Sequence, residues 1–326
     1  MRDQAGAQAG VVTGSPAPNV VVVAIAKNEG RFLLEWIAYH RLIGASAVLV
    51  YTNDCEDGSP ELLDRMQQLG LALHEPNPAR HGESPQRSAV LRASAHPCVT
   101  GSDYVLRIDL DEFLWVKAGA GHIRDLIATA PGADVICVQM RFFGDSGLLR
   151  LGDGLVIEQL TRASREDHGL NVMLKSLARN NGRLGRITTG HMADFRSGLA
   201  PRIFNSAGQE IPADAYGGER FRRMPEGFRS FRFAQLNHYC VRTFADFCAK
   251  RDRGDATGAH EKLDVTYWRS RNRNEQVDTG IVGHAAGVQA LIGEWLQDPQ
   301  LAACNRACFD AYARIRRRAE ETCQPR

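Results

Sequence analysis

The sequence predicts an α/β fold: a mostly parallel sheet flanked by helices, then a mixed second half and a helical C-terminus. The first observation behind this prediction is the aliphatic run Val20–Ala26, whose composition is typical of a strand buried on both faces of a parallel sheet. The second is that strand-like and helix-like segments alternate after it, as they do in right-handed βαβ units. Hydrophobic residues make up 44% of the chain, which is enough for a sizeable core.

A helix is expected directly after this first strand, over residues 31–44. Asn28 is a suitable N-cap for this helix, and Gly44 is a suitable stop. Its apolar residues recur at the spacing that places side chains on one helix face, namely Phe32, Trp36, Tyr39 and Ile43.

The second unit opens with a strand from Ala47 and passes through a polar turn at residues 53–60. Pro60 suits the first turn of the following helix, and Gly70 suits its end. A short strand with the sequence LALHE and a helix around residues 86–95 complete this region.

The strand YVLRIDL, residues 104–110, comes next and carries an acidic cluster at its C-terminal end. A further buried strand is expected over residues 134–143. Beyond it the pattern is irregular, with short strand-like pieces at residues 155–161 and 171–179. Helical composition returns at Phe244.

Residues 285–322 also have helical composition, with one break near Pro299. The mixed segment 141–232 is locally positive, with fifteen basic and ten acidic residues. The expected organisation is a flexible tail (1–18), one domain (19–284) with two halves (19–140 and 141–284), and a C-terminal helical extension (285–326).

Composition limits the function classes. The net charge of +2 gives no general attraction to nucleic acid, and the dominance of Arg over Lys fits a composition bias as well as phosphate recognition. No apolar run is long enough to cross a bilayer, whereas peripheral contact at the inner membrane face stays open. Eight scattered cysteines without a C-x-x-C pair predict reduced thiols and a cytoplasmic setting.

Three strand ends are polar, and parallel strands bring such ends to one crevice at the edge of the sheet. The polar ends are Lys27–Glu29, Asn53–Asp57 and Asp109–Glu112. In an extended segment Asp109 and Asp111 point to the same side, and two carboxylates suit Mn²⁺ or Mg²⁺. A cation also offsets the cost of placing carboxylates beside an apolar wall.

These motifs together resemble GT-A glycosyltransferases, in the family-two-like group related to galactan synthases. The stretches that carry the resemblance are AIAKNEGRFLLEWIAYHRLIGA, VYTNDCEDGSPELL, RIDLDEFL, LNHYCVRTFADFCAKRDRG and YWRSRNRNEQVDTGI. They cover roughly residues 20–281. Cys55 and Glu56 depart from the small polar residues that the group usually has in its nucleotide loop.

The resemblance implies a nucleotide-sugar donor and a divalent cation, Mn²⁺ or Mg²⁺. Asn28 and Glu29 would lie near the base or ribose, and the loop residues Asn53, Asp54 and Asp57 would lie near the ribose and uracil. Asp109 would contact ribose and metal, with Asp111 as the more direct metal ligand. The third ligand would be His238, with His191 as its competitor, and Lys175 is a candidate for contact with a phosphate.

The expected activity is metal-dependent transfer of a sugar, from a UDP-sugar by preference, to a hydroxyl of a glycan or glycolipid acceptor. The cation would stabilise the leaving diphosphate as a Lewis acid. The family-two likeness favours inversion, which needs a general base for the acceptor hydroxyl. Asp145 and Glu158 are candidates on position alone.

Other interpretations stay open. Asn28 and Glu29 can act as helix caps alone, Asp54 and Asp57 as turn formers, and His238 as a core histidine. At the level of function, the alternatives are a nucleotidyltransferase on a similar sheet, a non-catalytic carbohydrate-binding protein and a haloacid-dehalogenase-type phosphatase. The position of the acidic cluster after two βα units, instead of in the first strand, speaks against the phosphatase.

Overall fold

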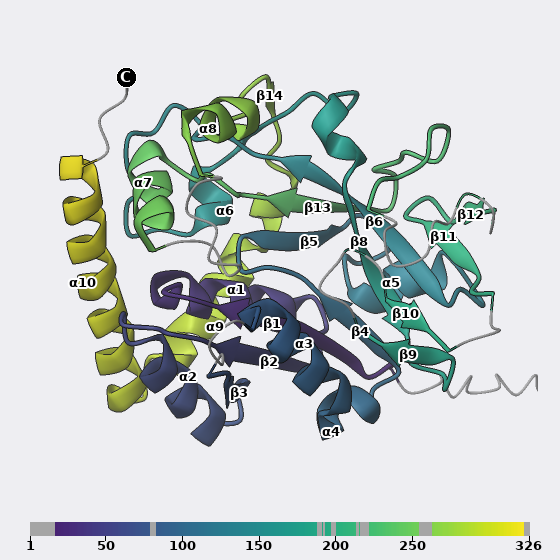
Figure 1. Ribbon diagram of the computed structural model, residues 1–326, viewed down its shortest axis with the longest axis horizontal. Helices are drawn as coiled ribbons and strands as arrows, with labels where there is room; N and C mark the ends of the chain where they lie inside the picture. Colours follow the sequence, from purple (N-terminus) through teal and green to yellow (C-terminus); the bar gives the residue numbers. More distant parts are fainter. Residues whose placement is uncertain are drawn as a thin grey trace, which may run out of the picture.

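The computed structural model describes residues 17–78, 83–187, 191, 193–196, 200–212, 215, 222–253 and 263–322. The predicted tail therefore lies outside the described residues, apart from its last two positions. Helices cover both faces of a central, mostly parallel sheet (Figure 1). Its main path is β12 (Glu210–Ile211), β11 (Ile203–Asn205), β6 (Val135–Phe142), β8 (Leu174–Arg179), β4 (Tyr104–Arg107), β1 (Val20–Ala26), β2 (Ala47–Thr52) and β3 (Leu73–Pro76).

Strand β1 lies inside this sheet, as its sequence predicts. It pairs in parallel with β2 on one side and with β4 on the other, and all of its residues are buried. Val20, Val22 and Ala24 belong to one core cluster, which also contains α1 (Gly30–Leu42), whereas Val21 and Val23 belong to the second. The second cluster includes α3 (Pro85–Ala95). A continuous β-branched run is therefore required, because both faces of the strand are covered.

The start of α1 differs from the prediction. Its N-cap is Glu29 rather than Asn28, and the Glu29 side chain makes no capping hydrogen bond. The carboxylate of Asp57 instead accepts a hydrogen bond from the Gly30 N–H at 2.7 Å. A side chain from the next βα unit thus satisfies one of the free N–H groups of the first turn.

The helix of the following βα unit starts and ends close to the residues that the sequence predicts. Helix α2 (Ser59–Gln68) has Pro60 in its first turn, and Gly70 follows it with a φ of 71°. A left-handed residue after the last turn is the conformation in which glycine commonly ends a helix.

The acidic cluster does not lie on an extended strand. Strand β4 ends at Arg107, residues 108–111 form a turn, and β5 (Glu112–Val116) begins directly after it. Strand β5 pairs antiparallel with β13 (Ala234–His238), which also pairs in parallel with β6. This register places His238 opposite Glu112 and so brings the end of β13 to the acidic turn.

The predicted strand-like piece at residues 155–161 is also wrong, because it contains the short helix α6 (Val156–Gln159). The buried carboxylate of Glu35, in α1, accepts hydrogen bonds from the N–H groups of Val156 and Ile157 at 2.8 and 3.1 Å. These bonds satisfy the free donors at the start of a helix. Burial raises the pKa of Glu35 to about 7, against the lowering effect of these bonds.

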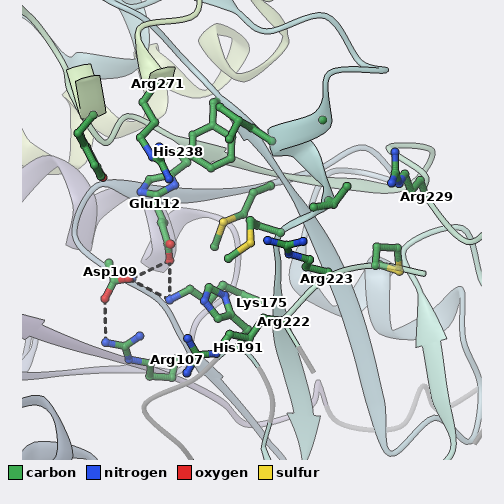
Figure 2. Close-up of a pocket in the computed structure, with 18 of the residues that line it drawn as sticks. Arg107, Asp109, Glu112, Lys175, His191, Arg222, Arg223, Arg229, His238 and Arg271 are labelled. Carbon is green, nitrogen blue, oxygen red and sulfur yellow. Dashed lines mark hydrogen bonds and ion pairs between the residues drawn. The ribbon is translucent and has the colours of Figure 1, made fainter. Parts of the chain in front are cut away.

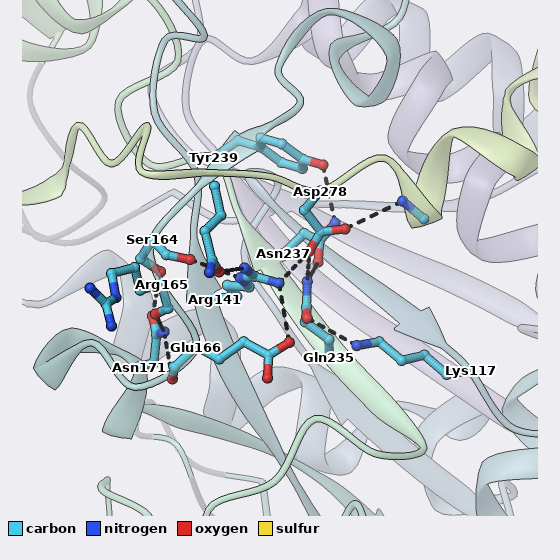
Figure 3. Close-up of polar contacts among 12 residues, drawn as sticks. Lys117, Arg141, Ser164, Arg165, Glu166, Asn171, Gln235, Asn237, Tyr239 and Asp278 are labelled. Carbon is cyan, nitrogen blue, oxygen red and sulfur yellow. Dashed lines mark hydrogen bonds and ion pairs between the residues drawn. The ribbon is translucent and has the colours of Figure 1, made fainter.

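A buried polar network ties the strand β14 (Gln276–Val277) to the sheet (Figure 3). Arg141, on β6, donates to the carboxylate of Asp278 at 2.8 Å and to the amide oxygen of Gln276 at 2.8 Å. Gln235, on β13, donates to the same Asp278 oxygen at 2.9 Å. Arg141 and Asp278 each have side chains only 6% exposed, so this ion pair lies inside the protein.

The C-terminal helices α9 (Ala285–Trp295) and α10 (Pro299–Thr322) confirm the expected break near Pro299. Helix α10 packs against α1, α2 and α7 (Phe244–Arg253) along one edge of the molecule (Figure 1). The expectation of reduced thiols is wrong at Cys248, on α7, which is disulfide-bonded.

The remaining elements are short: α4 (Pro97–Thr100), α5 (Ile123–Ala128), β7 (Arg162–Ala163), η1 (Gly169–Val172), β9 (Leu184–Arg186), β10 (Asp194–Phe195), α8 (Val265–Arg271) and η5 (Gly280–His284). Within the described part of the chain, no helix is both long and apolar enough to span a membrane.

Candidate functional site

A cavity of about 760 Å³ opens at the carboxyl ends of β4, β6 and β13 (Figure 2). Arg107 and Asp109 come from the end of β4, Phe142 from β6 and His238 from β13, and Lys175 near the start of β8 completes this wall. Ligands of open α/β sheets bind at this position, outside the carboxyl ends of the strands. The cavity is therefore the candidate site.

Protein cations balance the first part of the acidic turn. Asp109 lies 2.8 Å from the guanidinium of Arg107 and 2.9 Å from the ammonium of Lys175. Lys175 also lies 3.3 Å from the carboxylate of Glu112. Burial alone would raise the pKa of Asp109, but Arg107 and Lys175 outweigh it and hold this pKa below its usual value. Glu112 is more deeply buried, and burial raises its pKa.

Asp111 faces a different set of partners. Lys250, on α7, donates to one carboxylate oxygen at 2.7 Å and also to the carbonyl of Cys240 at 3.0 Å. The other oxygen lies 3.6 Å from Nε2 of His238. Burial opposes ionisation of Asp111, but Lys250 and His238 hold its pKa well below the usual range. Because the turn separates the two aspartates, they do not share partners as the extended-segment prediction expected.

Asp111 and His238 could hold a divalent cation as its two protein ligands. Oδ1 of Asp111 and Nε2 of His238 are 3.6 Å apart, a separation open to two ligands of one ion with bonds of about 2.1 Å. Nδ1 of His238 is buried without a hydrogen-bond partner among the described residues, and its ring lies against that of Phe142, with centroids 5.0 Å apart. No group of three His, Cys, Asp or Glu side chains converges as a metal site within the described ranges.

The competitor His191 also lines the cavity. Its Nδ1 donates to the carbonyl of Leu174 at 2.6 Å, which leaves Nε2 as the nitrogen with a free lone pair. Burial lowers the pKa of His191 to about 3, so the ring is neutral near pH 7. A neutral imidazole can act as a ligand or as a hydrogen-bond acceptor.

Of the predicted nucleotide-binding residues, Asp109 and Lys175 line the cavity, whereas the residues of the first two strand ends do not: Asn28, Glu29, Asn53, Asp54 and Asp57. Oδ1 of Asn28 accepts a hydrogen bond from the N–H of Glu56 at 2.7 Å, and Asn28 has a left-handed φ of 53°. Glu29 pairs with Arg242 at 3.1 Å. Asp57 holds the first turns of two helices, because its oxygens bond the N–H groups of Gly30 and Ser59.

Two residues of the same loop remain available for a ligand. Asn53 is 3% exposed, and its side-chain oxygen has no hydrogen-bond partner in the described part of the chain. Asp54 is exposed and has a left-handed φ of 46°. An orphaned buried oxygen is costly unless a donor reaches it, so Asn53 is the loop position that most needs a partner.

Neither of the predicted general bases lines the cavity. The carboxylate of Asp145 accepts hydrogen bonds from the side-chain amides of Asn272 at 2.8 Å and Asn274 at 3.1 Å. Glu158, on α6, accepts from the amide of Gln289 at 2.9 Å. Both residues thus hold surface elements together in this structure.

Sequence reasoning singled out Lys175 among the cations of the site, but not Arg107 or Lys250. Arg107 directly precedes the acidic turn, so its position in RIDLDE was a usable signal. Lys250 lies far from Asp111 in sequence, and only the helix α7 brings it close. Because arginine is frequent along the chain, the sequence did not indicate four further arginines that line the cavity: Arg222, Arg223, Arg229 and Arg271.

Comparison with known protein families supports a relation to sugar transferases. The model of glycosyltransferase family 92 matches residues 22–147, which include most of β1, the polar loop after β2 and the acidic turn. A family 92 protein of Ricinus communis is 25% identical over 141 residues, covering 41% of this chain and 24% of the relative. One of Oryza sativa subsp. japonica is 40% identical over 140 residues, covering 41% of this chain and 23% of the relative.

The chain thus spans about a quarter of the length of the curated relatives that it matches. Among solved structures, S. aureus TarS is similar at a TM-score of 0.36 and 10% identity, covering 78% of this chain and 43% of that one. Core-mannan synthase A of Aspergillus fumigatus is similar at a TM-score of 0.27 and 11% identity, covering 44% and 51%. TM-scores of this size do not establish a common fold.

The expected likeness to glycosyltransferases is therefore supported over residues 22–147, through family 92. The narrower placement in a family-two-like group stays a prediction.

Proposed function

We propose that this chain is a glycosyltransferase that moves a sugar from a nucleotide-sugar donor, a UDP-sugar by preference, to a hydroxyl of a glycan acceptor. The observation that carries the proposal is the acidic turn at the end of β4, which meets His238 and Lys250 beside a cavity. The family 92 match supports it, because the matched residues include this turn.

Asp111 and His238 would hold Mn²⁺ or Mg²⁺. When bound, the ion supplies Lewis acidity that stabilises the negative charge of the leaving nucleoside diphosphate. Lys175 and Arg107 keep Asp109 ionised, and Lys250 does the same for Asp111. The acidic turn therefore keeps two carboxylates charged over the neutral pH range, Asp109 at the cavity and Asp111 next to His238.

We propose transfer with inversion at the anomeric carbon, without assigning the general base that activates the acceptor hydroxyl. The two predicted candidates, Asp145 and Glu158, would have to leave their amide partners to reach the cavity. The carboxylates that do line it are Asp109 and Glu112, and both contact Lys175.

The test is calorimetric titration of the protein with a panel of nucleoside diphosphates, with Mn²⁺ and with a chelator. Wild type is compared with Asp111→Asn and with the control Asp153→Asn, which removes an exposed carboxylate away from the cavity. We expect one nucleotide to bind in a Mn²⁺-dependent way, with binding lost in Asp111→Asn and kept in the control. Absence of binding by every nucleotide, or equal binding by Asp111→Asn, would reject the proposal.

A further inference from the structure

The candidate cavity carries more positive charge than a nucleotide-sugar needs. Among the described residues, six cationic side chains line it, against the two carboxylates Asp109 and Glu112. The excess is therefore four positive charges, whereas the diphosphate of a nucleotide-sugar carries about two negative charges. A bound divalent cation would add to this excess.

Ion pairs among the described residues neutralise only part of this positive charge. Arg107 and Lys175 are paired with the acidic turn. The remaining arginines are in no ion pair with any residue that the structure describes: Arg222, Arg223, Arg229 and Arg271. Unpaired cations gathered in one cavity repel one another, so an anionic ligand would stabilise them.

The backbone holds these side chains at the rim of the cavity. The N–H of Leu174 donates to the carbonyl of Arg222 at 3.3 Å, and the N–H of Met224 donates to that of Val172 at 2.6 Å. Arg223 lies between these bonds, in a bridge with Met173, and the neighbouring Met224 is buried. The guanidinium of Arg271 packs over the ring of Tyr267 at 4.5 Å. The positive rim is therefore a built feature of the fold.

We propose that this rim binds the acceptor, and that the acceptor is an anionic glycan with carboxylate, sulfate or phosphate groups, held by Arg223 and Arg229. The inference rests on the proposed glycosyl transfer and names its acceptor class. All three groups present paired oxygens to the planar fork of Arg, which binds them through two parallel hydrogen bonds.

The position of the arginines favours the acceptor over the donor. Figure 2 shows Arg223 and Arg229 on the opposite side of the cavity from Asp109 and Arg107. They belong to the segment before β13, in the second half of the chain, whereas the acidic turn belongs to the first half. A diphosphate bound at the acidic turn thus leaves these arginines for a second anion.

The test is a titration with matched oligosaccharides in saturating UDP and Mn²⁺, so that the donor position is filled. The probes are a neutral oligogalactoside, an oligogalacturonate, a sulfated oligogalactoside and a polyol-phosphate oligomer of similar length. The variants are Arg223→Gln/Arg229→Gln, the charge-conserving Arg223→Lys/Arg229→Lys, and the control Arg179→Gln. Arg179 is exposed at the far end of β8 and does not line the cavity.

We expect at least one anionic probe to bind about tenfold or more tightly than the neutral one, with affinity falling as salt is raised. The Gln double variant should lose this preference and keep its affinity for UDP, whereas the Lys variant should retain part of it and Arg179→Gln all of it. The probe that binds identifies which of the three groups is recognised.

Equal binding of the neutral and anionic probes, or binding of none of them, would overturn the proposal. Competition between the anionic probes and UDP would also overturn it. The same holds if the Gln double variant lowers the affinity for UDP as much as the affinity for the probe, because the arginines would then bind the donor. If UDP itself fails to bind, the proposed function fails, and titration of the same probes without nucleotide still decides whether the rim selects anions.

Discussion

Asp111 shows how single residues make a charged turn tolerable beside an apolar core. Its side chain is 8% exposed, and the adjacent Leu110 and Phe113 are buried. Burying a carboxylate without a partner is expensive, but Lys250 contacts it at 2.7 Å and His238 lies on its other side. The pair is weak evidence for net stability, because both ions lose hydration, but losing one partner is costly.

We therefore expect Lys250→Met to destabilise the protein by about 3–5 kcal/mol, because it leaves Asp111 charged and buried. Urea denaturation followed by circular dichroism measures the free energy of unfolding. The double variant Lys250→Met/Asp111→Asn should recover most of the loss, since it also removes the stranded charge. A double variant as unstable as Lys250→Met would show that the loss comes from packing of the Lys stem and not from charge.

His40 makes a second residue-scale prediction, for the pH dependence of stability. It is fully buried, its Nδ1 donates to the carbonyl of Trp36 at 2.8 Å, and burial lowers its pKa from 6.5 to about 3. As the pH falls from 6.5 toward 3, the unfolded chain takes up a proton that the native ring does not bind. The free energy of unfolding therefore falls, by up to about 1.4 kcal/mol per pH unit from this group.

His40→Gln keeps a donor and an acceptor but does not titrate. Chemical denaturation between pH 6 and pH 4 measures the free energy of unfolding. With falling pH it should fall less steeply in this variant than in wild type, by up to about 1.4 kcal/mol per pH unit. Equal slopes in the two proteins would mean that His40 is protonated in the native state as readily as in the unfolded chain.

At the scale of elements, buried polar contacts decide which irregular segments join the sheet. Strand β14 is only two residues long and exposed, so its pairing with β7 contributes little by itself. Arg141 and Asp278 fix the segment instead, through an ion pair whose side chains are each 6% exposed (Figure 3). The surface pair Arg202–Glu210 has a similar distance, 2.8 Å, but side chains that are about half exposed.

Asp278→Ala should accordingly lower the free energy of unfolding by about 3–5 kcal/mol, because the buried Arg141 would keep its charge with only the exposed Glu166, at 3.7 Å, as an ionic partner. The matched control Glu210→Ala should cost less than about 1 kcal/mol, since exposed pairs gain little from their mutual attraction. Guanidinium denaturation of both variants measures the difference. Similar losses in the two variants would contradict the argument from burial.

At the scale of the whole molecule, α10 joins parts that are distant in sequence. Cys308 packs against Gly30 and Gly58, where an added Cβ would meet its sulfur at 2.7 and 3.3 Å. Tyr312 lies edge-on to Phe32, and its hydroxyl donates to the carboxylate of Asp246 at 2.9 Å. The C-terminal helix thus contacts both βα units at the start of the sheet and also α7.

Tyr312→Ala should therefore destabilise the whole domain, by about 3–5 kcal/mol for the loss of a buried aromatic side chain. Tyr312→Phe, which loses only the hydroxyl, should cost much less. Thermal unfolding followed by far-UV circular dichroism and by tryptophan fluorescence should shift as one transition in both variants. A separate early transition, with the main one unmoved, would show that α10 is an independent appendage.

Local patterns predicted the elements whose cause lies within their own sequence. Strand β1 follows from its β-branched run, α2 from Pro60 and Gly70, and the break before α10 from Pro299. These features limit the backbone wherever they occur, so they can be interpreted without knowing the neighbours.

The errors have causes that lie far away in the chain. Helix α6 forms where a strand was expected, because the carboxylate of Glu35 satisfies its first N–H groups. Asp57 bonds the N–H of Gly30, which the sequence did not indicate, and its contact with a nucleotide stays a prediction. The cytoplasmic setting stays a prediction, and the disulfide at Cys248 removes the argument from reduced thiols on which it was based.

The sequence predicted a site at the acidic turn and named Lys175 as a contact, but it did not indicate Arg107 or Lys250 as partners of the turn. The contact of Lys250 with Asp111 depends on the position of α7, and the place of Arg222 and Arg223 at the cavity depends on the backbone bonds of their segment to residues 172–174. Charge complementarity of this kind depends on tertiary contacts, so no spacing rule in one sequence reveals it.

The most direct test of sugar transfer is the release of nucleoside diphosphate from nucleotide-sugars, measured with Mn²⁺, with EDTA, and with EDTA followed by added Mn²⁺. Wild type should release product from at least one nucleotide-sugar, lose that activity with EDTA and regain it with Mn²⁺. Asp111→Asn should fall by about 100-fold or more, and the control Asp153→Asn should not change. Wild-type release that is absent with every nucleotide-sugar, or unchanged in Asp111→Asn, would contradict the assignment of the acidic turn as the centre of a glycosyltransferase.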